Sequence, residues 1–453
     1  GRWCDLSTAE RVSHGRCVRS VSSDTEHRSE FLRMLPKAEL HIHLDGCPRI
    51  NTLYDLCKEH GIQTPGNTPE TFRDCIFPSH YNSLADYLRG FAYTTAAMCT
   101  NSAIERISYE LAQDQWNDGV HYVEVRFAPQ LHVNSKHGVT VESAIESVHR
   151  GLQQAAAEIN ASLGDSEPEF RFGIIACILR SIQDMHGRGL SEYYEGILEA
   201  DRTAEHASVE LVEALISMRE QEKYQSGDET FPVVAIDIAG AEIGFPAMVH
   251  DTAYRAATQE LLLSRTVHAG EAVGPESIFE AVAHLHAHRV GHGIRIFDTE
   301  HLHEVGGKKL SGSDRRRFVE QLVKYVVGHD ILFEVCLTSN YQTCPTYASR
   351  PQDHPLRRML DGGLTVTLGV DNSLMSHTCL SREYGIAIDN HGVSRTELQQ
   401  MIWNGFRKGF LPCKNTNERA LYLRKIRQKY RTSILEDAMV HPYFPLHHHT
   451  PLY

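Results

Sequence analysis

Short apolar runs recur along the chain, and longer stretches with helical periodicity separate them. Eight of these runs are rich in β-branched residues, as buried parallel strands are. They cover residues 39–45, 121–127, 170–179, 233–240, 265–270, 289–294, 331–339 and 364–370. Helix-like patterns follow most of them, and this alternation predicts a (β/α)8 barrel, with an open doubly wound sheet as the alternative. The sequence contains no GxGxxG after the first run and no phosphate-binding GxxxxGK[ST], which counts against the alternative.

The spacing of the runs also predicts the domain organisation. Residues 46–118 separate the first two runs and contain several helix-like segments. A helical insertion there would lie over the carboxyl ends of the barrel strands, where a lid belongs. We expect residues 26–440 to form one domain, residues 1–25 a disordered polar tail, and residues 441–453 an irregular tail. The first segment lacks the apolar core of a secretory signal.

Composition narrows the class of protein further. The chain has 453 residues, of which 41% are hydrophobic and 23% charged, so it can bury a large core. The formal net charge is -13, which argues against nucleic acid or an anionic membrane as the partner. The sequence has no run of 18 or more apolar residues, so we expect no transmembrane helix. The 11 cysteines are scattered, which favours reduced thiols and a cytoplasmic location over a disulfide framework.

Histidines and carboxylates gather where the predicted strands end. His41 and His43 lie two residues apart on the first run, so strand alternation places both on one face. The others stand at or just beyond the fifth, sixth and eighth runs and are His268, Glu271, His292 and Asp371. Each alone could make a structural hydrogen bond or cap a helix. Together, at the ends where barrel enzymes hold their chemistry, they predict an active site.

The residue types indicate one bound metal ion. Three imidazoles (His41, His43 and His268) with the carboxylate of Asp371 suit zinc, or iron as a second choice, and leave a position for water. Such a metal lowers the pKa of its water toward 7 and so supplies a nucleophile. His292 and Glu271 are then free to act in proton transfer. The residues therefore predict metal-assisted hydrolysis without naming a substrate.

A family resemblance adds a substrate class. The segments KAELHIHLDG, YVEVRFAP, DIAGAE, HAGE, RVGHGIR, EVCLTSN and TVTLGVDN, in this order, resemble the adenosine deaminase family of the amidohydrolase superfamily. The resemblance spans about residues 36–425. It implies the same (β/α)8 fold and one Zn²⁺ per chain, held by His41, His43, His268 and Asp371.

The resemblance also implies a reaction on a small purine nucleoside. Water would attack C6 of adenosine, or of 2′-deoxyadenosine, to give inosine and ammonia in purine metabolism. Glu271 would protonate the purine N1, and His292 would orient the attacking water. The residues expected to contact the substrate are His43, Asp45 at the ribose 5′ end, Gly240 through its backbone N–H, and Asn372.

One position departs from the family pattern. The best-known members have a second aspartate after the metal-binding one, whereas here Asp371 is followed by Asn372. Purine N7 accepts a hydrogen bond, and an asparagine amide donates at every pH. We therefore expect Asn372 to donate to N7, with capping of the following helix as the alternative.

Two other functions stay open. The first is a related deaminase that acts on adenine, AMP or an N6-methylated adenine nucleotide, although Asp45 at the 5′ end favours a nucleoside over a phosphate. The second is a non-catalytic, growth-factor-like or binding relative, which would be expected to have lost ligands that are all present here. The zinc deaminases with H-x-E and P-C-x-x-C are a poorer match, since neither element is present. The oligomeric state is left open.

Overall fold

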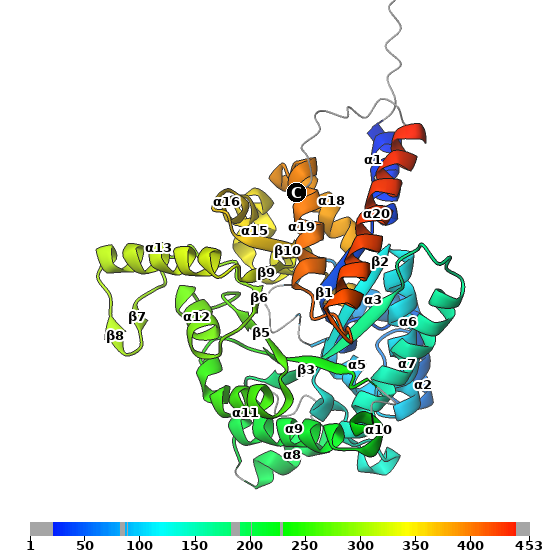
Figure 1. Cartoon of the computed structure of the whole chain (residues 1–453). Coiled ribbons are helices and arrows are strands. Elements are labelled where there is room, and N and C mark those ends of the chain that lie inside the picture. The colour runs from blue at the N-terminus through cyan, green and yellow to red at the C-terminus, as the bar shows by residue number, and fades with distance from the viewer. Residues whose placement is uncertain are drawn as a thin grey trace, which may run out of the picture.

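Eight parallel strands form one sheet in the order β1-β2-β3-β4-β5-β6-β9-β10 (Figure 1). The computed structural model describes residues 21–81, 87, 89–182, 191–200, 202–226 and 230–440. The strands are Lys37–His43 (β1), Val120–Phe127 (β2), Arg171–Leu179 (β3), Val233–Ala239 (β4), Ser264–Ala269 (β5), Arg289–His292 (β6), Leu332–Val335 (β9) and Thr365–Leu368 (β10). A parallel bridge between Ile42 and Asp371 joins the last strand's end to the first strand. The predicted (β/α)8 barrel is confirmed.

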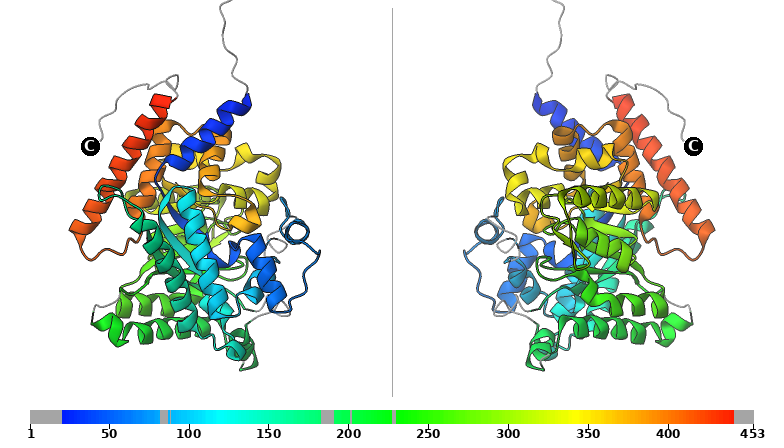
Figure 2. Two further views of the ribbon diagram at one scale, coloured as in Figure 1. Left: turned by 90° about the vertical axis from the view of Figure 1, so that its right-hand side faces the viewer. Right: turned by 90° about the vertical axis from the view of Figure 1, so that its left-hand side faces the viewer.

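Helices follow the strands and cover the outside of the barrel (Figures 1 and 2). After β2 to β5 come α7 (Val141–Ala161), α8 (Glu192–Glu199), α9 (Ala204–Arg219), α10 (Glu222–Gln225), α11 (Asp251–Leu261) and α12 (Pro275–Phe279). After β6, β9 and β10 come α13 (Gly312–Gly328), α14 (Leu337–Thr343), α15 (Pro345–Ser349), α16 (Leu356–Asp361), α17 (Ser373–Ser376), α18 (Leu380–His391), α19 (Arg395–Lys408) and α20 (Thr416–Val440). A small hairpin of β7 (Glu304–Val305) and β8 (Lys308–Lys309) precedes α13. Capping boxes at Thr140, Thr203 and Ser394 start three of these helices by satisfying their first free N–H groups.

The connection between β1 and β2 is helical. It contains α2 (Ile50–Glu59), α3 (Pro69–Ile76), α5 (Phe91–Ala97) and α6 (Asn101–Asn117). The Tyr81 hydroxyl donates to the carbonyl of Met375 at 2.9 Å, and His377 Nε2 donates to the carbonyl of Phe77 at 2.6 Å. These contacts hold the insertion against the segment that follows β10, at the carboxyl ends of the strands. Its action as a lid stays a prediction.

The termini require one correction. Helix α1 (Val21–Met34) begins inside the stretch expected to be a disordered tail, so that prediction was wrong for residues 21–25. Arg28 forms a two-pronged ion pair with Asp389 of α18, at 2.5 and 2.7 Å, which fastens α1 to the barrel. Residues 1–20 and the predicted tail 441–453 lie outside the described residues.

The hydrophobic core lies on both faces of the strands. All eight residues of β2 are buried, as expected for a barrel strand with side chains on one face and helices on the other. Within the described residues, no helix is long and apolar enough to cross a membrane. The cytoplasmic location stays a prediction.

Candidate active site

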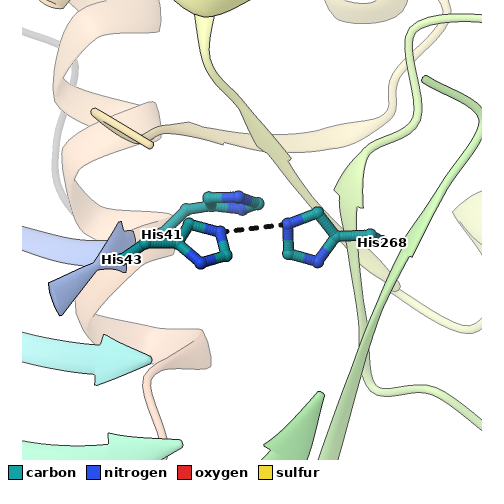
Figure 3. A group of neighbouring side chains, drawn as sticks. All are labelled: His41, His43 and His268. Atoms are coloured by element: carbon teal, nitrogen blue, oxygen red, sulfur yellow. Dashed lines mark hydrogen bonds between the residues drawn. The ribbon is translucent and has the colours of Figure 1, made fainter. Parts of the chain in front are cut away.

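Three histidine rings and one carboxylate converge at the carboxyl ends of β1, β5 and β10. His43 Nε2 lies 3.2 Å from His268 Nε2 and 3.4 Å from Asp371 Oδ1, and His41 Nε2 lies 3.8 Å from the same oxygen. Figure 3 shows the rings of His41 and His43 reaching from β1 toward His268 on the opposite side. The structure thus brings together all four residues that the sequence proposes as metal ligands.

The outer nitrogens of two of these rings are held by buried carboxylates. Glu334 Oε2 is 2.8 Å from His41 Nδ1, and Asp237 Oδ2 is 3.0 Å from His268 Nδ1. Each carboxylate accepts the Nδ1 proton and so leaves Nε2 with its lone pair toward the common point. His41 Nε2 is buried and has no hydrogen-bond partner among the described residues. This unsatisfied nitrogen, with two more imidazoles and a carboxylate around it, fits a zinc-like ion.

The charges around the rings favour neutral imidazoles on β1. Burial, together with nearby Arg126 and the other histidines, lowers the pKa values of His41 and His43 well below 6.5. His268 differs, because the Asp237 carboxylate outweighs the effect of burial and raises its pKa. Conversely, His268 and Arg126 hold the pKa of Asp237 far below its usual value, although burial alone would raise it.

Arg126 ties the two supporting carboxylates together. Its guanidinium lies 2.7 Å from Asp237 and 2.7 Å from Glu334, and all three side chains are completely buried. Arg289 adds a contact of 2.6 Å to Glu334 and another to Glu124. Buried charges are stable only when paired in this way. The network therefore fixes the carboxylates that orient the rings of His41 and His268.

His292 and Asp371 occupy unusual backbone positions. Their φ angles are 62° and 66°, in the left-handed region that costs a residue with a side chain of order 1–3 kcal/mol. Gly291, next to His292, leaves room for the rings of His41 and His268, since a Cβ there would lie 3.0 Å from His41 Cε1 and 3.3 Å from His268 Cγ. His292 Nε2 is 3.8 Å from Glu271 Oε2, so the two proposed proton-transfer groups face each other.

Glu242 anchors the loop that carries Glu271. Its carboxylate accepts the backbone N–H groups of Gly270, Glu271, Ala272 and Val273 at 2.7–3.1 Å. Burial raises the pKa of Glu271 to about 7, and the negative charge of Glu242 acts in the same direction. The site thus favours a protonated carboxyl at Glu271 near neutral pH.

The three remaining sequence-predicted residues lie near the same strand ends. Asp45 follows β1 in a short turn (Leu44–Gly46), is 4% exposed, and has an Oδ1 without a partner among the described residues. Gly240 follows β4 with a φ of 101°, which a larger residue would avoid. Asn372 donates from Nδ2 to the Tyr87 hydroxyl at 2.9 Å. It occupies the N-cap position of α17 but makes no capping bond with its side chain, so the capping alternative was wrong.

The sequence reasoning missed the residues that support the site. Asp237, Glu242 and Glu334 all lie inside the segments that carry the family resemblance, but no role was given to them, whereas Arg126 was expected to form an internal ion pair that supports the barrel. Charged residues within apolar strand runs were the available signal, because an unpaired charge is rarely buried. Their partners could not be read from the sequence, since they lie on other strands or, for Glu242, in the loop after β5.

Comparison with known proteins identifies the family. The sequence profile described as "Adenosine deaminase" matches residues 36–188 and 195–422. Adenosine deaminase 1 of Streptomyces coelicolor is 32% identical over 388 residues, which is 84% of this chain and 84% of that protein. A probable adenosine deaminase of Dictyostelium discoideum is 30% identical over 392 residues, which is 86% of this chain but 42% of that protein. The chain belongs to the adenosine deaminase family. It is therefore placed among the hydrolases that deaminate purines.

Solved structures share the fold. Adenine deaminase from Arthrobacter aurescens has a TM-score of 0.66 at 22% identity, over 88% of this chain and 99% of that one. N6-methyl-AMP deaminase from Arabidopsis thaliana has a TM-score of 0.63 at 20% identity, over 90% and 99%. An amidohydrolase from Burkholderia ambifaria with bound Zn has a TM-score of 0.67 at 19% identity, over 94% and 97%.

Proposed function

We propose that this protein is a zinc-dependent adenosine deaminase that converts adenosine, and 2′-deoxyadenosine, to inosine and ammonia. Two groups of side chains that could hold a metal ion share His41 and carry the proposal: one adds His43 and His268, the other adds Asp371 and His292, and Glu271 lies beside His292. When bound, zinc supplies the Lewis acid that makes water a competent nucleophile near neutral pH. The zinc in the Burkholderia ambifaria neighbour is consistent with this choice of metal.

The residues of the chain divide the remaining work. Glu271, with its pKa raised to about 7, would donate a proton to the purine N1 as water attacks C6. His292 would hold the attacking water by a hydrogen bond. Gly240 would donate its backbone N–H to N3, Asn372 would donate to N7, and Asp45 would accept from the ribose 5′ hydroxyl. Ammonia leaves from C6, and the product is inosine.

A combined metal and activity assay tests the proposal. The native protein should contain about one zinc per chain and release ammonia from adenosine. Removal of the metal with a chelator should abolish turnover, and added zinc should restore it. His268→Ala should lose both metal and activity, while Lys308→Ala, on the exposed β7–β8 hairpin, serves as the control. Full turnover after exhaustive chelation contradicts the proposal.

A second class of substrate, adenine and adenine nucleotides, stays an alternative because proteins of similar fold act on it. The structural neighbours from Arthrobacter aurescens and Arabidopsis thaliana act on adenine and on N6-methyl-AMP. Asp45 argues against a phosphate at the 5′ end, because burial already raises its pKa to about 7 and a second negative charge beside it would raise the pKa further, which costs binding energy. Turnover of adenosine, adenine, AMP and N6-methyl-AMP under one set of conditions separates these substrates. We expect the highest kcat/KM with adenosine.

A further inference from the structure

Buried polar side chains run from His292 away from the metal-binding group. Asn340 lies in α14 and His354 lies just before α16, and none of the three side chains is more than 2% exposed. Asn340 Nδ2 is 3.2 Å from His292 Nδ1, and Asn340 Oδ1 is 3.2 Å from His354 Nε2. The backbone N–H of Leu356, at the start of α16, donates to His354 Nδ1 at 3.2 Å. The contacts form one continuous row.

The last contact fixes the direction of every hydrogen bond in the row. A backbone N–H can only donate, so His354 Nδ1 must carry a lone pair, and a neutral His354 then carries its proton on Nε2. That proton is donated to Asn340 Oδ1, which leaves the Asn340 amide nitrogen to donate to His292 Nδ1. Reversal of the amide would place its N–H against the His354 Nε2–H.

The surroundings of His354 keep it neutral. Burial lowers its pKa well below 6.5, and the neighbouring His391 and His292 act in the same direction. The other rings against it are Tyr341 and Tyr347, at centroid distances of 5.8 and 5.1 Å, and neither tyrosine carries a charge near neutral pH. Because the Leu356 N–H occupies Nδ1, a protonated His354 would lose this bond and place two N–H groups together.

We infer that Asn340 and His354 are positioning residues that hold His292 as the tautomer with its proton on Nε2. His292 then presents an N–H donor, rather than a lone pair, to the side where Glu271 Oε2 lies 3.8 Å away. It can orient the attacking water by donating to its oxygen, but it cannot take that water's proton in the resting state. The inference rests on the role given to His292 in the proposed function.

Asn340→Asp reverses the hydrogen bond to His292 with little change in the size or shape of the side chain. The new carboxylate accepts from both histidines, so His292 would carry its proton on Nδ1 and present a lone pair to the site. We expect kcat to fall roughly 10²–10⁴-fold at pH 8–9, since a positioned proton-transfer group contributes about this much and a catalytic histidine held as the wrong tautomer can cost about 10⁴-fold. A buried carboxyl has a raised pKa. As the pH falls toward 6 it should protonate and donate to His292 again, so the ratio of variant to native kcat should rise.

A matched control separates this effect from the cost of a buried carboxyl. Asn404→Asp introduces the same change at a buried asparagine in α19, which donates to the carbonyl of Val366 at 2.9 Å. It should lower the melting temperature without a pH-dependent recovery of kcat. Thermal unfolding and metal content of both variants show whether each is folded and loaded.

Two substitutions at His354 test the inference independently of Asn340. His354→Gln can still donate from its amide nitrogen to Asn340 and accept from the Leu356 N–H, so kcat should stay within about 5-fold of native. His354→Leu removes the donor and frees the Asn340 amide to turn, so kcat should fall at least 10-fold more than in the Gln variant while KM changes less. ¹⁵N NMR of histidine-labelled protein, with the His292 signal assigned through His292→Gln, reports the tautomer without turnover.

The outcomes distinguish this inference from the proposed function. An Asn340→Asp variant with native kcat from pH 6 to 9, or a native His292 with its proton on Nδ1, overturns the inference. Equal losses in His354→Gln and His354→Leu also overturn it, because a packing role alone would then suffice. If the native protein deaminates no purine, the proposed function fails, and the NMR measurement still decides the tautomer.

Discussion

At the scale of single residues, Glu271 faces the proposed reaction site, and its surroundings favour the protonated form that a general acid needs. Its pKa is raised to about 7 by burial, so the carboxyl is protonated below that pH and loses its proton as the pH rises through it. A general acid works only while protonated. We therefore expect kcat/KM to fall on the alkaline side with an apparent pKa near 7, in a pH–rate profile of the native protein.

Glu271→Gln tests the same residue by substitution. Glutamine keeps the size but cannot donate a proton to N1, so kcat should fall roughly 10²–10⁴-fold with the metal retained. Glu276→Gln, on the neighbouring α12, is the control and should remain within a few-fold of native. Near-native kcat in Glu271→Gln excludes the role of general acid.

Asn372 is the residue at which this chain leaves the family pattern. One N–H of its amide is committed to Tyr87, and its Oδ1 is buried without a partner in the part of the chain that the structure describes. The second N–H of the same nitrogen is the one that N7 would use. Asn372→Ala should lose about 1–3 kcal/mol of transition-state stabilisation, which is roughly 5- to 150-fold in kcat/KM.

Comparison variants identify what the Asn372 amide contacts. Asn372→Asp should lose kcat/KM as the pH rises, because only a protonated carboxyl can donate to N7. Tyr87→Phe should have a smaller effect than Asn372→Ala if Tyr87 only positions the amide. 7-Deazaadenosine, which lacks the N7 acceptor, should be a poor substrate. If Asn372→Ala turns over adenosine at native efficiency, Asn372 does not contact N7.

The sequence predicted the cluster of candidate metal ligands better than the residues that support it. His41 and His43 share a face by strand alternation, and a barrel brings the ends of its strands together, so the cluster followed from general geometry. The row behind His292 did not follow, because Asn340 and His354 are 48 and 14 residues from their respective partners. Their contact depends on how α14 and α16 pack, and no local pattern encodes that packing.

At the scale of elements, the loop after β5 is held in place by Glu242, a residue that follows β4. Four consecutive backbone N–H groups and the Ser277 hydroxyl donate to the single carboxylate of Glu242. Glu242→Gln replaces one acceptor oxygen with a donor and removes the charge. We expect a loss of about 1.5–3 kcal/mol in unfolding free energy and a lower kcat, since Glu271 moves with the loop.

Thermal unfolding and steady-state kinetics on the Glu242 variant measure both effects. Glu280→Gln, at a partly buried carboxylate in the short π-helix Glu280–His284 after α12, is the control and should change neither by much. A Glu242→Gln variant with native stability and native kcat would show that the loop keeps its conformation without the carboxylate.

The strands were easier to predict than the points where they end. Buried parallel strands are apolar throughout, so the runs were visible, but an apolar run does not stop where a strand does. The run at 331–339 is strand only over Leu332–Val335, and its last residues begin α14. Helix α1 was missed because its sequence is polar. It is held by contacts with distant residues, such as the Arg28–Asp389 pair with α18, which no local pattern shows.

At the scale of the whole molecule, buried charges form a framework inside the barrel. Arg126, Arg289, Glu124, Asp237 and Glu334 come from four different strands, and each is completely buried. Loss of one partner would leave an unpaired buried charge, which typically costs 3–5 kcal/mol.

Arg126→Met should therefore lower both the melting temperature and the zinc affinity, since Asp237 and Glu334 also orient His268 and His41. Calorimetry and metal titration measure the two effects, and Arg265→Met, on the half-exposed start of β5, is the control.

Metal retention should depend on pH through His268. His41 and His43 have pKa values well below 6.5 and stay neutral at pH 6, so protons compete little for them. The pKa of His268 is raised by Asp237, so this ring takes up a proton first as the pH falls, and a protonated imidazole cannot bind a metal. The apparent Kd for zinc should therefore be nearly constant at high pH and should rise about tenfold per pH unit once the pH drops below the raised pKa of His268. Bound zinc adds about 4 kcal/mol to the stability at a free concentration 1,000 times Kd, so the difference in melting temperature between loaded and chelated protein should shrink over the same range. His268→Ala should show no such difference at any pH. An apparent Kd that does not change between pH 8 and pH 5 would mean that His268 is not a ligand or that its proton does not compete with the metal.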